Sequence, residues 1–112
     1  MMSTRIKSAL WIQSQVRMCD IQCIPIFIRK KGDPDGGAII LKIERGGKGS
    51  SVYAQARTPE GKLAWMPGGG GEILTDEEAE NYIKRQISFD PDLWVVEVED
   101  PDGRYELDGE CL

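Results

Sequence analysis

Two short acidic strings carry the side chains best suited to metal-assisted chemistry. Asp33-Pro34-Asp35 and Asp90-Pro91-Asp92 each place two carboxylates around a proline. Hard cations prefer oxygen ligands, so the four aspartates could form a magnesium or calcium site for a hydrolase. Neither string has the spacing of a known calcium loop, however, and aspartate beside proline commonly caps a turn. We therefore expect each string to cap its own turn, and the two strings to lie apart.

The lack of histidine removes many catalytic mechanisms from consideration. The chain contains no histidine, which excludes histidine-activated nucleophiles, histidine metal ligands and histidine proton shuttles. The glycine-rich stretch Gly46–Gly49 lacks the Ser or Thr that a phosphate-binding loop needs after its lysine. The second glycine run, Gly68–Gly71, misses the dinucleotide-binding fingerprint. We therefore expect no catalytic residue of these kinds and no bound cofactor.

Charge is distributed unevenly along the chain, whose net charge is −5. Residues 1–57 carry ten basic and four acidic side chains, a net of +6, whereas residues 58–112 carry four basic and fifteen acidic ones, a net of −11. The basic stretch Arg29–Lys31, with Lys42 on the next predicted strand, could bind phosphate groups. The pI of about 4.7 argues against a nucleic-acid partner. We expect the two halves to neutralise each other within one fold.

Five side chains mark a candidate interaction surface. Phe27 and Tyr53 are aromatic residues on predicted strands, Trp65 precedes the second glycine run, and Arg29 and Lys31 add positive charge beside Phe27. Large amphipathic aromatic residues are typical of protein interfaces. If helices cover one face of the sheet, the other face would present these aromatic residues to a protein partner or to a second copy in a homodimer.

Apolar runs separated by turn residues predict a sheet. Three turns of the type Pro-acidic-Gly begin at Pro34, Pro59 and Pro101, and Gly46–Gly49 forms a fourth. The runs predict strands over Ile24–Lys31, Ala38–Glu44, Ser51–Arg57, Lys62–Met66 and Leu93–Asp100, with a weak closing strand over Arg104–Leu107. The first four would form a meander, because hairpin turns join strands that are neighbours in sequence.

Two helices complete the predicted elements. Helical spacing of apolar residues predicts a helix over about Ser8–Ile21, with a strand over Ala9–Gln13 as the alternative. The second helix follows Thr75, which forms a capping box with Glu78, and ends near Ser88 because of the proline that follows. We expect a single α+β domain over residues 1–112, in which both helices pack on one face of an antiparallel sheet of five or six strands.

We find neither a membrane span nor an export signal in the sequence. No run approaches the roughly 18 apolar residues that span a bilayer, and residues 1–15 lack the apolar segment of a secretion signal. Three cysteines, an odd number, make a disulfide framework a poor interpretation. We therefore expect a cytoplasmic protein without a membrane partner.

Three segments resemble a known bacterial family. The longest is Arg85–Asp100, which contains a fairly specific Asp-Pro-Asp-Leu-Trp block, and the others are Arg29–Ala38 and Leu10-Trp11-Ile12 followed by Arg17. Over nearly its whole length the chain resembles the domain-of-unknown-function 1491 family of small uncharacterised bacterial proteins. The resemblance implies a bacterial cytosolic protein and assigns no activity, cofactor or catalytic residue.

Two functions from different classes therefore remain. The first is a small binding or protein-interaction module without catalytic activity, which the missing catalytic groups and the uneven charge favour. The second is a carboxylate-based, metal-dependent hydrolase that uses the two Asp-Pro-Asp strings. A cleft with converging carboxylates would favour the hydrolase, and an exposed apolar patch would favour the interaction module.

Overall fold

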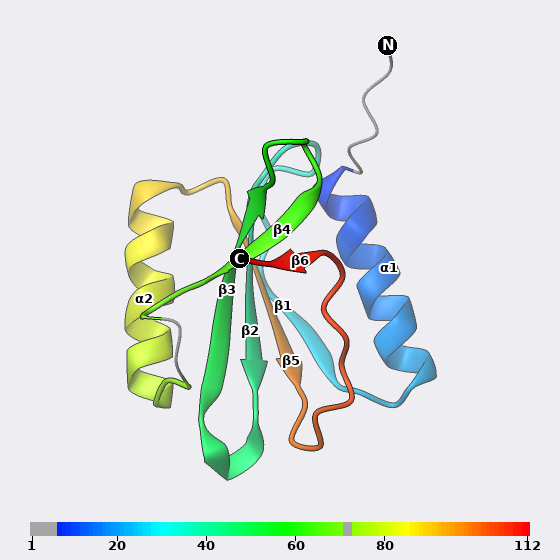
Figure 1. Ribbon diagram of the computed structural model, residues 1–112, viewed down its shortest axis with the longest axis vertical. Helices are drawn as coiled ribbons and strands as arrows, with labels where there is room; N and C mark the ends of the chain where they lie inside the picture. The colour runs from blue at the N-terminus through cyan, green and yellow to red at the C-terminus, as the bar shows by residue number, and fades with distance from the viewer. Residues whose placement is uncertain (1–6, 71–72) are drawn as a thin grey trace.

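The computed structural model describes residues 7–70 and 73–112, in which a six-stranded sheet lies between two helices (Figure 1). The elements in chain order are α1 (Ser8–Ile21), β1 (Ile26–Lys30), β2 (Ile39–Glu44), the 3₁₀ turn η1 (Gly46–Lys48), β3 (Ser50–Arg57), β4 (Leu63–Pro67), α2 (Asp76–Phe89), β5 (Trp94–Glu99) and β6 (Glu110–Cys111). Both helices and the first five strands are confirmed close to their predicted bounds. The prediction of a closing strand over Arg104–Leu107 is wrong. Gly71, the last residue of the glycine run Gly68–Gly71, lies outside the described residues.

The sheet is mixed, which corrects the expectation of an antiparallel sheet. Its strand order is β1-β5-β2-β3-β4-β6. β5 pairs antiparallel with β1 but parallel with β2, and β6 pairs parallel with β4. The predicted meander holds only from β2 to β4, since β5 lies between β1 and β2. The physical reason is α2, a connection long enough to return the chain so that β5 runs in the direction of β2.

The two helices cover opposite faces of the sheet, which corrects the expectation that both pack on one face (Figure 1). Ile12 of α1 belongs to a core that includes Leu41 of β2, whereas Ile83 of α2 belongs to a second core that includes Ile40. Neighbouring residues of a strand point to opposite faces, so β2 is buried on both sides. A strand that is apolar on both faces needs a cover on each. The homodimer predicted through an open sheet face therefore loses its basis.

The ends of α2 are fixed by local sequence. The Thr75 hydroxyl accepts a hydrogen bond from the Glu78 amide at 3.1 Å, and the Glu78 carboxylate accepts one from the Thr75 amide at 2.9 Å. The predicted capping box is thus confirmed. Across the described residues, neither helix is long and apolar enough to cross a membrane.

Candidate functional site

The two Asp-Pro-Asp strings lie next to each other, which corrects the expectation that they are apart. Because β5 runs antiparallel beside β1, the segment that enters β5 adjoins the segment that leaves β1. The Asp33 amide donates to the Asp92 carbonyl at 2.8 Å, and the Trp94 indole donates to the Asp33 carbonyl at 2.8 Å. The contact between the strings is therefore made by backbone groups and an indole.

The carboxylates of these strings serve their own loops. Asp33 Oδ2 accepts from the Gly36 amide at 2.9 Å, and Asp90 Oδ1 accepts from the Asp92 amide at 3.1 Å, so the predicted turn capping is confirmed for these two residues. Asp35 forms an exposed ion pair with Lys7 at 3.5 Å. Within residues 7–70 and 73–112, no group of three or more Cys, Asp or Glu side chains is placed to hold a metal ion.

A charged cluster lies between the sheet and α2. It consists of Arg29 of β1, Lys42 of β2, Glu97 of β5, and Asp76 and Glu80 of α2. The Lys42 side chain is only 3% exposed, and its Nζ lies 2.7 Å from both Asp76 Oδ1 and Glu80 Oε2. Arg29 binds Glu80 with two nitrogens and Glu97 at 3.1 Å. The cluster therefore ties β1, β2 and β5 to one side of α2.

The electrostatics of this cluster follow from its contacts. The hydrogen bond from Arg29, assisted by Lys42, lowers the pKa of the Glu80 carboxyl from its ordinary 4.5 to about 2. Burial acts to lower the pKa of Lys42, but the hydrogen bonds to Asp76 and Glu80 outweigh it, and the pKa is raised. Basic groups of the first half of the chain thus pair with acidic groups of the second, which confirms the predicted neutralisation within one fold. These cations are engaged by carboxylates and do not form a free phosphate site.

The predicted aromatic residues do not share one surface. Phe27 is 49% exposed on β1, whereas Tyr53 on β3 is half-buried against the core under α1. Trp65 is fully buried, with its ring centroid 5.3 Å from that of Trp11 and its indole nitrogen donating to the Asp108 carbonyl. The prediction that Trp65 belongs to an interaction surface is therefore wrong. Of the predicted surface, Phe27, Arg29 and the exposed Lys31 remain together on β1 and directly after it.

The turn between α1 and β1 has a defined geometry. The Cys23 amide donates to the Asp20 carbonyl at 3.2 Å, and the Ile24 amide donates to the Cys19 carbonyl at 2.8 Å. These two bonds form a Schellman motif, in which the residue after the cap adopts a left-handed conformation. Cys23 occupies that position with φ of 58°, where glycine is usual. The buried Ile24 and Cys19 supply the apolar contact of the motif.

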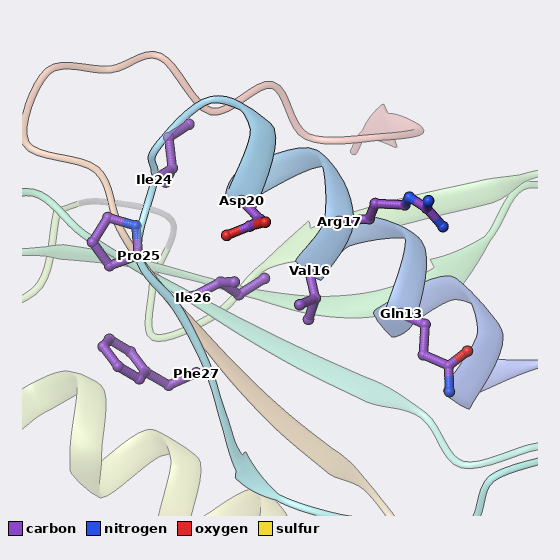
Figure 2. A pocket seen from close by; sticks show the side chains of 8 residues that line it. All are labelled: Gln13, Val16, Arg17, Asp20, Ile24, Pro25, Ile26 and Phe27. Carbon is purple, nitrogen blue, oxygen red and sulfur yellow. The ribbon is translucent and has the colours of Figure 1, made fainter.

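A groove runs between α1 and β1 (Figure 2). It holds about 500 Å³ and is lined by Gln13, Val16, Arg17, Asp20, Ile24, Pro25, Ile26 and Phe27. The α1 residues are spaced three and four apart, so they share one side of the helix. Figure 2 shows Ile26 pointing toward Val16 and Phe27 pointing away from α1. The groove is therefore apolar at its floor and charged along its helical wall.

β1 forms one edge of the sheet, and no other strand in the described part of the chain pairs with its outer side. The Glu99 amide donates to the Pro25 carbonyl at 2.9 Å, which shows which backbone groups face β5. These groups alternate along an antiparallel strand. Pro25 and Phe27 therefore face β5, whereas the amides and carbonyls of Ile26 and Ile28 point outward. Ile28 is 42% exposed, so apolar side chains flank these free groups.

Sequence reasoning identified Phe27 but missed that its strand is an edge. One signal was present, because Pro25 precedes the strand and Lys30 and Lys31 follow its apolar centre. Proline and lysine are common on edge strands, where they limit unwanted pairing. Here they leave Ile26–Ile28 as the open stretch.

Comparisons with known proteins agree on one family. The profile of DUF1491, described as a protein of unknown function, matches residues 6–108. A crystal structure of a DUF1491 family protein from Caulobacter crescentus CB15 is similar with a TM-score of 0.85 and 26% identity, covering 96% of this chain and 100% of that one. An NMR structure of a DUF1491 family protein from the same source has a TM-score of 0.83 and 25% identity, covering 98% and 99%.

A more distant structure shares the fold. The solution structure of protein Atu0922 from A. tumefaciens has a TM-score of 0.72 and 23% identity, and the match covers 93% of this chain and 90% of that one. No curated protein matches the chain.

Proposed function

We propose that this chain, which belongs to the DUF1491 family of unknown function, is a protein-interaction module without catalytic activity. Its binding element is the open edge of β1, where an extended segment of a protein adds to the sheet as a further strand. We also propose that it acts in the cytoplasm, which its free cysteines Cys19, Cys23 and Cys111 favour.

The observation that carries the proposal is the coincidence of free backbone groups and exposed apolar side chains on β1. The outward groups of Ile26 and Ile28 supply main-chain hydrogen bonds for strand addition. Phe27 and Ile28 are about half exposed beside these groups, and the groove against α1 lies next to them. In strand addition, such pockets beside alternate side chains provide specificity.

The opposite edge of the sheet offers no equivalent stretch. There β6, which has two residues, covers β4. Very short edge strands are one way in which proteins prevent further pairing. Between the two edges, β1 is therefore the one suited to receive a partner.

The hydrolase remains the alternative, but the arrangement of its carboxylates lends it little support. Asp33 and Asp90 are occupied by backbone amides of their own loops. A metal-dependent enzyme would bind its cation in the folded state and gain stability from it. We expect millimolar magnesium or calcium to leave the melting temperature unchanged. A clear upward shift that Asp90→Asn abolishes would place the hydrolase ahead of the interaction module.

The proposal can be tested with random 12-residue peptides displayed on phage. The target is the full chain, and the counter-selection uses Ile28→Pro. The Ile28 amide points outward, so proline removes a free donor and leaves the bonds to β5 in place; proline is tolerated at such edge positions. We expect enriched peptides with apolar residues at alternate positions that bind the Ile28→Pro variant at least about tenfold more weakly.

A side-chain variant keeps this test decisive if Ile28→Pro fails to fold. Phe27→Ala should weaken the binding of the same peptides. Phe89→Ala, at an exposed phenylalanine at the end of α2, should leave their binding unchanged. The proposal is wrong if no peptide is enriched, or if enriched peptides bind the wild type and the β1 variants equally.

A further inference from the structure

We infer that the segment received by this edge is β1 of a second copy of the chain, added antiparallel about a two-fold axis at Phe27. The inference rests on the proposed function, because it uses the same edge, and it adds the identity of the partner. The assembly would join two six-stranded sheets into one continuous sheet.

The free backbone groups determine the register of this pairing. In an antiparallel pair, two opposed residues exchange both hydrogen bonds only if both point toward the other strand. On β1 these residues are Ile26 and Ile28. Self-pairing that uses both must place Ile26 opposite the partner's Ile28 and, by symmetry, Ile28 opposite the partner's Ile26. Phe27 then lies opposite the partner's Phe27 at the axis.

The next register toward the end of the strand is unfavourable. It would place Ile26 opposite the partner's Lys30, which follows an irregularity in the β1–β5 ladder and pairs with Val95. The Lys30 Nζ also donates to the Leu93 carbonyl at 3.1 Å, so this side chain is engaged on the α2 side of its own subunit. The irregularity thus limits self-pairing to the three apolar residues.

The side chains match in the favoured register. Phe27 and the partner's Phe27 form a non-hydrogen-bonded pair, in which Cα atoms approach to about 4.5 Å and side chains are close. Aromatic cross-strand pairs are among the stabilising ones. Ile26 meets the partner's Ile28 on the opposite face, where the groove beside Val16 can receive that side chain (Figure 2). In each opposed pair, the residues from both copies are therefore apolar.

Charge is also complementary beyond the paired residues. α1 ends at Ile21 with no basic residue in its last turn, and Asp20 is exposed there. This end of a helix carries partial negative charge, to which the Arg104 guanidinium already donates at the Gln22 carbonyl at 2.9 Å, and the exposed Asp20 carboxylate adds a full negative charge. In the antiparallel arrangement, the exposed Lys31 of one copy approaches the α1–β1 turn of the other. The two-fold axis repeats this contact, so the basic end of each β1 meets the acidic end of the partner's α1.

Disulfide cross-linking tests the register directly. In a chain with Cys23→Ser and Cys111→Ser, Phe27→Cys would place two thiols opposite each other at a spacing that a disulfide can bridge. We expect Phe27→Cys to give covalent dimers at least about tenfold faster than Phe89→Cys, an exposed control at the end of α2 that is not part of the paired strand. Ile28→Cys should react more slowly than Phe27→Cys, because Ile28 is offset from the axis.

Light scattering on the unmodified chain tests the association itself. The interface is short, so we expect a weak dimer whose mass rises from 12.5 kDa toward twice that value between about 10 µM and 1 mM. Phe27→Lys should hold the mass at the monomer, because two like charges would oppose each other at the axis. Phe89→Lys should leave the association unchanged.

The outcomes separate this inference from the proposed function. A monomer at all concentrations, or cross-linking of Phe27→Cys no faster than that of Phe89→Cys, overturns the second copy as the partner. If displayed peptides still bind in a manner sensitive to Ile28→Pro, the edge receives a different protein and the proposed function stands. If neither association nor peptide binding depends on β1, the second copy as the partner and the proposed function are both wrong.

Discussion

The charged cluster predicts that the stability of the fold depends on the ionisation of Glu80. The pKa of this carboxyl is about 2 against an ordinary 4.5, owing to Arg29 and Lys42. At about 1.4 kcal/mol per pKa unit, a shift of this size corresponds to about 3 kcal/mol at neutral pH. The Glu80 side chain is 25% exposed, so solvent screening reduces this contribution. We expect Glu80→Gln to lower the free energy of unfolding at pH 7 by about 1–2 kcal/mol.

The sign of the shift determines the pH dependence. Since the folded-state pKa of Glu80 lies below its ordinary value, the ionised carboxylate stabilises the fold above about pH 4.5. This contribution is lost as the pH falls from 4.5 toward 2. The wild type should therefore lose stability more steeply than the Glu80→Gln variant in this window, and more than half of their difference should be gone by pH 3.

Urea unfolding followed by tryptophan fluorescence at pH 7, 5, 4 and 3 measures both effects. The control is Glu106→Gln, which removes an exposed carboxylate outside the cluster and should change stability by less than about 0.5 kcal/mol. The reasoning is refuted if Glu80→Gln matches this control at pH 7. It is refuted equally if a deficit at pH 7 persists unchanged at pH 3.

Three further substitutions test local geometry by the same unfolding assay. Cys23→Gly should stabilise by about 0.5–1 kcal/mol by relieving the left-handed conformation, and a loss would contradict the Schellman assignment. Thr75→Ala should cost about 1 kcal/mol through loss of the cap, and a change within error would mean that Thr75 contributes little. Gly37→Ala should cost at least about 2 kcal/mol, since its Cβ would lie 2.5 Å from the Asp92 carbonyl oxygen; the control Gly36→Ala, whose Cβ would make only an ordinary contact of 3.6 Å with Asp33 Oδ2, should cost far less.

Local features of the fold could be predicted because their causes lie within a few residues. The capping box of Thr75 and Glu78, and the turns at Gly46–Gly49 and Pro59, require no knowledge of distant contacts. The position of β5 in the sheet, by contrast, depends on contacts between residues far apart in the sequence. It depends on whether Val96 pairs beside Ile28 and Leu41 or at the outside of the sheet, and both arrangements have the same alternation in sequence.

The two-sided cover of the sheet has a signal in the sequence. Ile39–Leu41 is apolar without alternation, which indicates a strand buried on both faces. Trp65 shows the opposite case. Its burial depends on Trp11 and on the Asp108 carbonyl, which is 43 residues away, so its position beside a glycine run indicated exposure that the fold does not provide.

The insertion of β5 also explains why β1 is the candidate site. In the predicted meander, β1 would have paired with β2, and Arg29 would have had no carboxylate from β5 beside it. Because β5 is the neighbour of β1, Glu97 of β5 forms an ion pair with Arg29 of β1. The backbone groups of Phe27 point toward β5. The charge of the basic stretch is thereby drawn toward α2, while Ile26 and Ile28 keep free amides on the outside. The predicted meander also ends in β1, so the long-range pairing with β5 does not create the edge; it determines which backbone groups of this edge strand are used and leaves those of Ile26 and Ile28 on the outer side.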